Sequence, residues 1–188
     1  MREGPERRSV DGSTILFEEA SLERIEAQDA EALLFPLFRE ERPPSGLLGA
    51  VDWRFGGRIS RLIAEGRVAS DLGALSLLPA RRRLPSIDKV LIVGMGTMEA
   101  FSEEHYSDYL SVIEEGIRPL AIRSLGMTLP GRALKMIEAA AAFESLIKHP
   151  RVPFALDLIV FDRHEAVKEM GTILATAKRR TRAYDLEG

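Results

Sequence analysis

A glycine turn is the segment of this 188-residue sequence whose residue types are best suited to hold a ligand. The turn, residues 94–97 (Gly-Met-Gly-Thr), directly follows the apolar run 90–93. At the end of a buried strand, such glycines leave room for backbone amides to cradle a phosphate. The dinucleotide-binding pattern would have a third small residue where this sequence has Glu99, and Glu103 and Glu104 place negative charge at the start of the next helix. A turn that merely ends the strand is therefore the favoured interpretation, and a phosphate-binding turn is the alternative.

Residue patterns for covalent catalysis or metal binding are missing from the sequence. There is no cysteine, and hence no thiolate nucleophile or thiolate zinc ligand. The three histidines, His105, His149 and His164, lie in three different segments without a carboxylate or second histidine at ligand spacing. The sequence has no Gly-x-Ser-x-Gly elbow and no Gly-Lys-Ser or Gly-Lys-Thr phosphate loop. We therefore expect no catalytic residue, no metal site and no resident cofactor.

Two basic runs could contact an anionic partner, one at residues 81–83 and one at 178–182. No aromatic side chain for base stacking is interleaved with either run. The net charge of the chain is −3, whereas dedicated nucleic-acid binders usually carry a basic excess. A solvated surface is the favoured interpretation of both runs. The single tryptophan, Trp53, is expected in the core, with an interface as the alternative.

These segments must be positioned by alternating strands and helices, because the period of the apolar residues changes repeatedly along the chain. Short apolar runs predict six strands, at 14–18, 32–38, 72–78, 87–93, 124–129 and 154–161. Apolar residues at helical spacing predict four helices, at 54–65, 102–123, 132–148 and 163–179. This alternation is typical of an α/β fold with a largely parallel sheet covered on both faces. Pro36 indicates an edge position or a bulge for the second strand, and Pro119 should kink or break the second helix.

Length and composition predict one soluble domain. Apolar residues make up 45% of the chain and charged residues 29%, close to the average for globular domains. No linker or repeat divides the sequence, so residues 13–188 are expected to form a single domain after a loosely ordered N-terminus over 1–12. No apolar run approaches the ~20 residues of a membrane span, and no secretory signal follows the polar start. We expect a cytoplasmic protein.

Four segments, in this order, resemble the N-terminal domain of the leucyl aminopeptidase family. They are the strand 31–38, the small-residue segment 46–52 with glycines following at 56 and 57, the strand 75–78, and the segment 88–96, which ends in Gly-Met-Gly. The resemblance covers residues 14–180. It implies a macro-domain-like, three-layer α/β/α fold, in which a mixed, mostly parallel sheet lies between two helical layers.

The same resemblance implies that the catalytic machinery of the peptidases, with two metal ions, lies in a separate C-terminal domain. This sequence has no segment like their metal-binding motif Asn-Thr-Asp-Ala-Glu-Gly-Arg. The expected function is therefore that of a non-catalytic accessory or regulatory domain that binds protein. Its expected partner is a second copy of the chain or a peptidase; the sequence carries no strong signal for nucleic-acid binding, and no membrane partner is expected.

The macro-domain likeness also implies an alternative, namely binding of a nucleotide or an ADP-ribose-like ligand at the carboxyl ends of the strands. ADP-ribose-binding macro domains use asparagine-rich and glycine-rich loops, whereas this sequence has no asparagine and only one glycine in the loop 127–131. Hydrolysis of ADP-ribose conjugates is a third alternative, weakened by the same missing asparagine. The ligand-contact candidates lie in two loops that follow strands: Gly94, Gly96, Thr97, Thr128 and Gly131.

Overall fold

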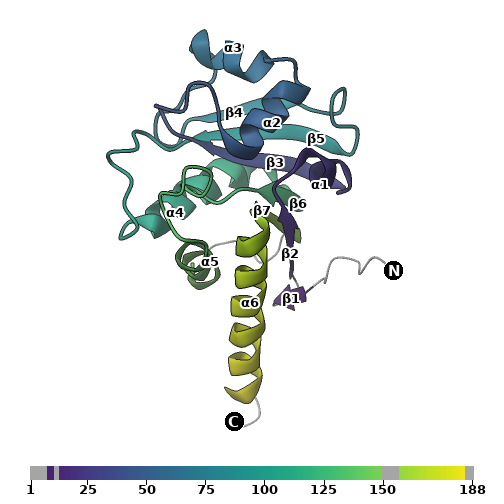
Figure 1. Cartoon of the computed structure of the whole chain (residues 1–188), viewed down its shortest axis with the longest axis vertical. Coiled ribbons are helices and arrows are strands. Elements are labelled where there is room, and N and C mark those ends of the chain that lie inside the picture. The colour runs from purple at the N-terminus through teal and green to yellow at the C-terminus, as the bar shows by residue number, and fades with distance from the viewer. Residues whose placement is uncertain (1–7, 11–12, 150–156, 185–188) are drawn as a thin grey trace.

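A mixed sheet forms the middle layer of the protein (Figure 1). The computed structural model describes residues 8–10, 13–149 and 157–184, and within them the sheet has seven strands in the order β1-β2-β7-β6-β3-β5-β4. The inner five strands run parallel, and β1 and β4 pair antiparallel at the two edges. The strands are β1 (Arg8–Val10), β2 (Ser13–Glu19), β3 (Ala30–Leu37), β4 (Leu75–Pro79), β5 (Ile87–Gly94), β6 (Ser124–Met127) and β7 (Asp157–Asp162).

Helices cover both faces of this sheet, which confirms the three-layer α/β/α fold (Figure 1). Apolar residues of α1, α2 and α3 form one core cluster with the sheet, and those of α4, α5 and α6 form a second cluster on the opposite face. The helices are α1 (Leu22–Glu26), α2 (Gly46–Arg54), α3 (Arg58–Ala64), α4 (Tyr106–Ile117), the 3₁₀ turn η1 (Arg118–Leu120), α5 (Ala139–Lys148) and α6 (His164–Tyr184).

The side chains of β5 show why its sequence is apolar without interruption. Val90 and Ile92 belong to the core cluster of α2 and α3, whereas Leu91 and Val93 belong to the cluster of α4 and α5. All four side chains are fully buried. Because successive residues of a strand point to opposite faces, a strand between two helical layers needs apolar residues at every position. The strand predicted at 87–93 is confirmed as β5.

β3 is a central strand, so the edge position indicated by Pro36 is wrong. β3 pairs with β5 along its length, but it pairs with β6 only from Ala32 to Leu34. Pro36 therefore lies beyond the last pair that β3 makes with β6. A proline at that position leaves the ladder between β3 and β6 intact, although it has no amide hydrogen to donate.

The helices on the α4 side begin later than the apolar spacing predicted. The helix predicted at 132–148 begins at Ala139, because residues 131–137 form turns in which Lys135 has a φ of 57°. The helix predicted at 102–123 begins at Tyr106. It ends at Ile117, where a 3₁₀ turn containing Pro119 follows, so the predicted break at this proline is confirmed.

On the other face, the predicted helix 54–65 is α3 alone, and α2 precedes it. Gly57 separates the two helices with a φ of 73°, a left-handed conformation that favours glycine. The expectation that Trp53 lies in the core is wrong. Its side chain is 75% exposed, since Leu47, Leu48 and Val51 occupy the buried face of α2.

The first described residues form a strand, and the last predicted strand is described only in part. Residues 8–10, expected in a loosely ordered N-terminus, form β1, which pairs with β2. The strand predicted at 154–161 corresponds to β7, and its residues 154–156 lie outside the described residues. No helix in the described part of the chain is long and apolar enough to cross a membrane.

Candidate functional site

The topology brings the five ligand-contact candidates to one edge of the sheet. β3 lies between β5 and β6, so the turn after β5 and the loop after β6 flank the carboxyl end of β3. Gly94, Gly96 and Thr97 lie at the first of these strand ends, and Thr128 and Gly131 lie at the second. Their common location follows from the parallel sheet. Their role as ligand contacts stays a prediction.

The turn after β5 is held by the segment that precedes β4. The amide of Gly94 donates to the carbonyl of Ala74 at 2.8 Å, and the amide of Gly96 donates to the carbonyl of Ser70 at 2.8 Å. A Cβ atom on Gly94 would overlap the carbonyl oxygen of Asp71, and Gly96 has a φ of 76°. Both glycines are therefore required by the backbone itself, and two amides that could cradle a phosphate already have partners.

The loop after β3 holds the same turn from its other side. The carboxylate of Glu40 accepts the amide of Met98 at 2.9 Å, and the amide of Arg39 donates to the carbonyl of Gly96 at 2.9 Å. Thr97 lies half-buried between these contacts. A glutamate bound to this turn opposes a phosphate there, because two negative charges repel at short range.

The loop after β6 is closed by an aromatic ring. Gly131 has a φ of 75°, and a Cβ atom added to it would lie 2.8 Å from the ring of Phe101. Its carbonyl accepts the amide of Met136 at 2.9 Å, and the amide of Thr128 donates to the carbonyl of Leu34 at 3.3 Å. The glycine is needed here because the Phe101 ring packs directly on its backbone.

Four rings, which we call the Phe101 cluster, fill the space at the end of β3 between the two loops. The Phe101 ring packs edge-on against Phe38, the residue after β3, with centroids 5.3 Å apart, and against Tyr106 at 6.1 Å. Its centroid lies 5.0 Å from that of Tyr109. Edge-to-face packing at these distances is the favoured geometry of aromatic side chains. The chain's own side chains thus occupy the space between the two glycine loops.

The two tyrosines of this cluster use their hydroxyl groups to tie backbone segments together. Tyr106 donates to the carbonyl of Pro130 at 3.3 Å, and Tyr109 donates to the carbonyl of Ala100 at 3.0 Å. Burial raises the pKa of Tyr106 well above its usual value, and the nearby Arg132 guanidinium lowers it by a smaller amount. Burial also raises the pKa of Tyr109. Both hydroxyls therefore remain protonated donors at neutral pH.

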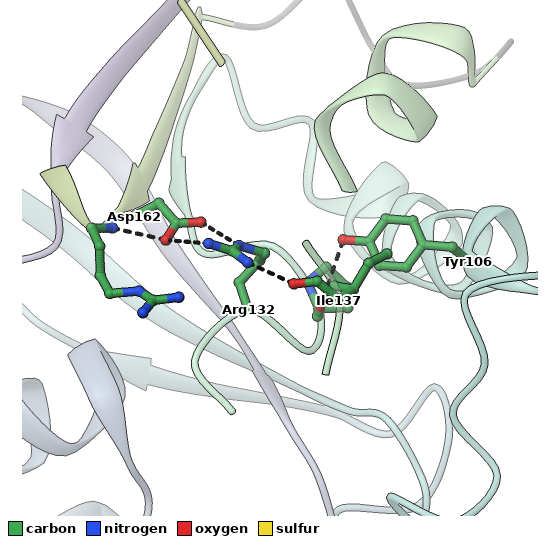
Figure 2. A network of polar contacts seen from close by, with 6 residues as sticks. Tyr106, Arg132, Ile137 and Asp162 are labelled. Atoms are coloured by element: carbon green, nitrogen blue, oxygen red, sulfur yellow. Dashed lines mark hydrogen bonds and ion pairs between the residues drawn. The ribbon is translucent and has the colours of Figure 1, made fainter. Parts of the chain in front are cut away.

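A buried ion pair joins the loop after β6 to the end of β7 (Figure 2). The Arg132 guanidinium donates to the two carboxylate oxygens of Asp162 at 2.7 and 3.1 Å, and to the carbonyl of Ile137 at 2.6 Å. The amide of Arg163 donates to the same carboxylate at 2.8 Å. The sequence does not predict this pair, because the two residues lie 30 positions apart and no motif connects them. Each charge is fully occupied, so the pair is suited to fastening the loop rather than to chemistry.

A shallow hollow of about 230 Å³ lies beside this pair, between the starts of α5 and α6. Arg132 and Arg163 line it together with three glutamates, Glu138, Glu165 and Glu169. This mixture of charges matches neither an anionic nor a cationic ligand. Among the described residues, no three His, Cys, Asp or Glu side chains lie close enough to hold a metal ion.

A contact between Ser111 and His149, which the sequence does not predict, joins α4 to the end of α5. The hydroxyl of Ser111 on α4 lies 3.0 Å from Nε2 of His149, which is buried at the end of α5. The same hydroxyl donates to the carbonyl of Ser107 at 3.1 Å. Since a serine hydroxyl has one proton to donate, this geometry joins α4 to α5 and does not present an activated nucleophile.

Comparison with known families finds a matching model. The model of the cytosol aminopeptidase family, N-terminal domain, matches residues 34–148. A probable cytosol aminopeptidase of Thermosynechococcus vestitus is 31% identical over 110 residues, which are 57% of this chain and 22% of that protein. The cytosol aminopeptidase of Pseudomonas aeruginosa is 29% identical over 119 residues, which are 63% of this chain and 23% of that protein. The chain thus spans less than a quarter of the length of these relatives.

Solved structures with the same fold include macrodomains and a leucine aminopeptidase. An Oceanobacillus iheyensis macrodomain with ADP has a TM-score of 0.68 at 12% identity, covering 94% of this chain and 98% of that one. A mutant of tomato leucine aminopeptidase has a TM-score of 0.56 at 13% identity, covering 89% of this chain and 36% of that one. At such identities these similarities establish the fold alone.

Proposed function

Because the chain belongs to the cytosol aminopeptidase family, whose N-terminal domain it matches, we propose that it acts without chemistry of its own as an accessory or regulatory domain that binds protein. Residues 13–188 make up this single domain. The matched relatives carry the name cytosol aminopeptidase, which supports a cytoplasmic location. The matched region is the N-terminal domain only, and this supports a role other than peptide hydrolysis.

The observation that carries the proposal is the closed carboxyl edge of the sheet. Ligands of open α/β sheets bind in a crevice outside the carboxyl ends of the strands. In this chain the Phe101 cluster fills that position, and Glu40 holds the amide of Met98 beside it. A nucleotide or ADP-ribose-like ligand would have to displace a packed aromatic ring from Gly131. This supports a protein-binding role over the small-molecule alternative.

The outer edge of β4 is the surface that supports self-association. β4 is an edge strand, and Leu77 at its centre is 53% exposed; Leu72, shortly before it, is 57% exposed. An edge strand with exposed apolar side chains is a ready template for pairing with another chain. A second copy of this chain, or an aminopeptidase chain with the same domain, is the proposed partner.

Light scattering coupled to size-exclusion chromatography tests this proposal. We expect a mass above the 20.9 kDa of one chain, with the fraction of the larger species rising with protein concentration. Leu77→Lys should return the protein to a monomer, because a charge on the edge strand would be buried without a partner. Thr172→Lys, which adds the same charge at an exposed position of α6, is the control and should leave the mass unchanged.

A monomer at every concentration that also fails to co-elute with a purified cytosol aminopeptidase would contradict the proposal. A larger species that persists in Leu77→Lys would contradict the placement of the contact at β4 while leaving self-association intact.

A further inference from the structure

Exposed basic residues gather on α3 and on the turn between β4 and β5. The segments 53–67 and 80–89 contain eight Lys and Arg residues and two Asp and Glu residues, a net charge of +6 in a chain of net charge −3. Four exposed arginines in them form no ion pair with any described residue. We call these four the arginine face: Arg58, Arg61, Arg82 and Arg83.

The fold holds these arginines over one end of the sheet. The apolar residues between them, Ile59 and Ile63 of α3 and Ala80 and Leu84 of the turn, are buried in the same core cluster. With those side chains directed inward, the arginines that alternate with them are directed outward. Figure 1 shows α3 lying above the β4–β5 side of the sheet, away from α5 and α6. The two segments that carry the arginines thus pack on the same face of the sheet.

Trp53 belongs to the same part of the molecule. The buried carboxylate of Asp52 accepts the amide of Ile59 at 2.7 Å and that of Ser60 at 3.2 Å, so it fixes the start of α3 against the end of α2. Trp53 is the next residue, with its indole 75% exposed. An exposed indole is thereby held at the end of α2, which is fastened to the start of α3. The basic run at 81–83 contains no aromatic residue, but the fold supplies one from α2.

We propose that the arginine face and Trp53 bind a single-stranded nucleic acid. Guanidinium groups donate to phosphate oxygens in a bidentate manner, and four of them can follow a short stretch of sugar–phosphate backbone. An exposed indole offers a face on which an unpaired base stacks. Together they make the combination of a basic track and an aromatic platform by which proteins bind single strands with little sequence preference.

The surroundings of Trp53 favour a nucleic acid over an acidic protein. Protein interfaces are built around an apolar core with a polar rim. Here Trp53 stands alone, because the other large exposed apolar residues of the described chain, Leu72 and Leu77, lie on β4 and the loop before it. The side chain of Leu77 is on the sheet face of Leu91, which packs with α4 and not with α3. An isolated indole among arginines suits a base and its phosphates better than an apolar partner surface.

Trp53 is the only tryptophan of the chain, so its fluorescence reports binding directly. The probe is a thymidine oligonucleotide of about 12 nucleotides, within the range of site sizes known for single-strand binders. We expect the emission to be quenched on titration, with a Kd of about 1–100 µM at physiological salt. The logarithm of the binding constant should fall with that of the salt concentration with a slope of about −3, as expected for four neutralised phosphates.

Two variants and a control separate the contributions. Arg82→Glu combined with Arg83→Glu should weaken binding by about tenfold or more and flatten the salt dependence. Trp53→Ala, measured by anisotropy of a labelled oligonucleotide, should weaken binding by roughly tenfold while leaving the salt slope unchanged, since stacking releases no counterions. The control is Arg123→Glu combined with Lys168→Glu, which makes the same charge change at exposed positions outside the arginine face. Because these positions lie outside the proposed contact, this variant should weaken binding by no more than about twofold relative to the unmodified protein.

Three results would overturn the proposal. One is oligonucleotide binding without a change in Trp53 emission, which would show that no base stacks on the indole. Another is tighter binding of a duplex of the same length, in which the bases are not free to stack. The third is equal binding of poly-glutamate, which would assign the surface to acidic proteins. Circular dichroism of each variant verifies that the fold is retained.

Discussion

Arg132 shows how a single residue can decide where a helix begins. Its guanidinium is only 5% exposed, and it reaches Asp162 at the end of β7 while also binding the carbonyl of Ile137. Residues 131–137 must therefore fold as turns around this side chain, and α5 begins only at Ala139. Local apolar spacing contains no information about a partner 30 residues away.

Removing one partner of this pair should destabilise the fold strongly. For Asp162→Ala, we expect the free energy of unfolding to fall by about 3–5 kcal/mol, because Arg132 would be left buried with an uncompensated charge. Urea unfolding measures the difference. Asp71→Ala is the matched control, since Asp71 pairs with Arg39 at 2.6 Å on the surface, and we expect a loss below about 1 kcal/mol. Equal losses for the two variants would contradict the account of the buried pair.

Tyr106 predicts how stability depends on alkaline pH. Burial raises its pKa above the ordinary value of 10.0. Above that pH, the unfolded chain releases the phenolic proton while the folded chain keeps it, so stability falls as the pH rises. The stabilisation from the protonated Tyr106 is fully present below the ordinary pKa of the unfolded chain. It is lost as the pH rises through the raised pKa of the folded chain. Denaturant unfolding as a function of pH should show a shallower alkaline decline in Tyr106→Phe; an unchanged decline would show that other groups cause it.

At the level of the elements, the turn after β5 owes its glycines to packing. For Gly94→Ala, the new methyl group would overlap the backbone at Asp71, so β5 or the segment before β4 would have to move. We expect a loss of about 1–3 kcal/mol in stability without any ligand, by chemical denaturation. Gly116→Ala on α4 is the control, because nothing lies within 4 Å of the added carbon, and a helical alanine should stabilise by about 0.5–1 kcal/mol. A neutral Gly94→Ala would contradict this interpretation.

The elements that were predictable are those whose signals are local. The residues of β5 alternate between two buried faces, and parallel pairing places its glycine turn and the loop after β6 on the two sides of the end of β3. α2 was missed because Gly46 and Gly49 weaken its helical pattern, although its two leucines are buried. The closure of the candidate site depends on Phe101 meeting Phe38 and Gly131, which are distant in sequence. Such long-range contacts have no local sequence signal.

For the whole molecule, the family match confirms the resemblance drawn from four short segments, and the three-layer fold follows. Two surfaces differ in character. The outer edge of β4 exposes leucines, whereas α3 and the β4–β5 turn expose arginines with Trp53. The net charge of −3 gives no indication of this second surface, because a net charge does not show where on the molecule the basic residues gather. At the carboxyl edge of the sheet, the rings of the Phe101 cluster pack against one another.

The central claim, that the Phe101 cluster closes the carboxyl edge to nucleotides, is tested most directly by thermal unfolding with ADP-ribose. A ligand at about 100 times its Kd would stabilise the fold by about 2.7 kcal/mol, or roughly 5–10 °C in Tm for a chain of this length. We predict no shift with ADP-ribose or with ADP. A clear shift, accompanied by changes in the amide signals of Gly94, Gly96, Thr97, Thr128 and Gly131, would contradict the claim and establish a ligand site between the two glycine loops.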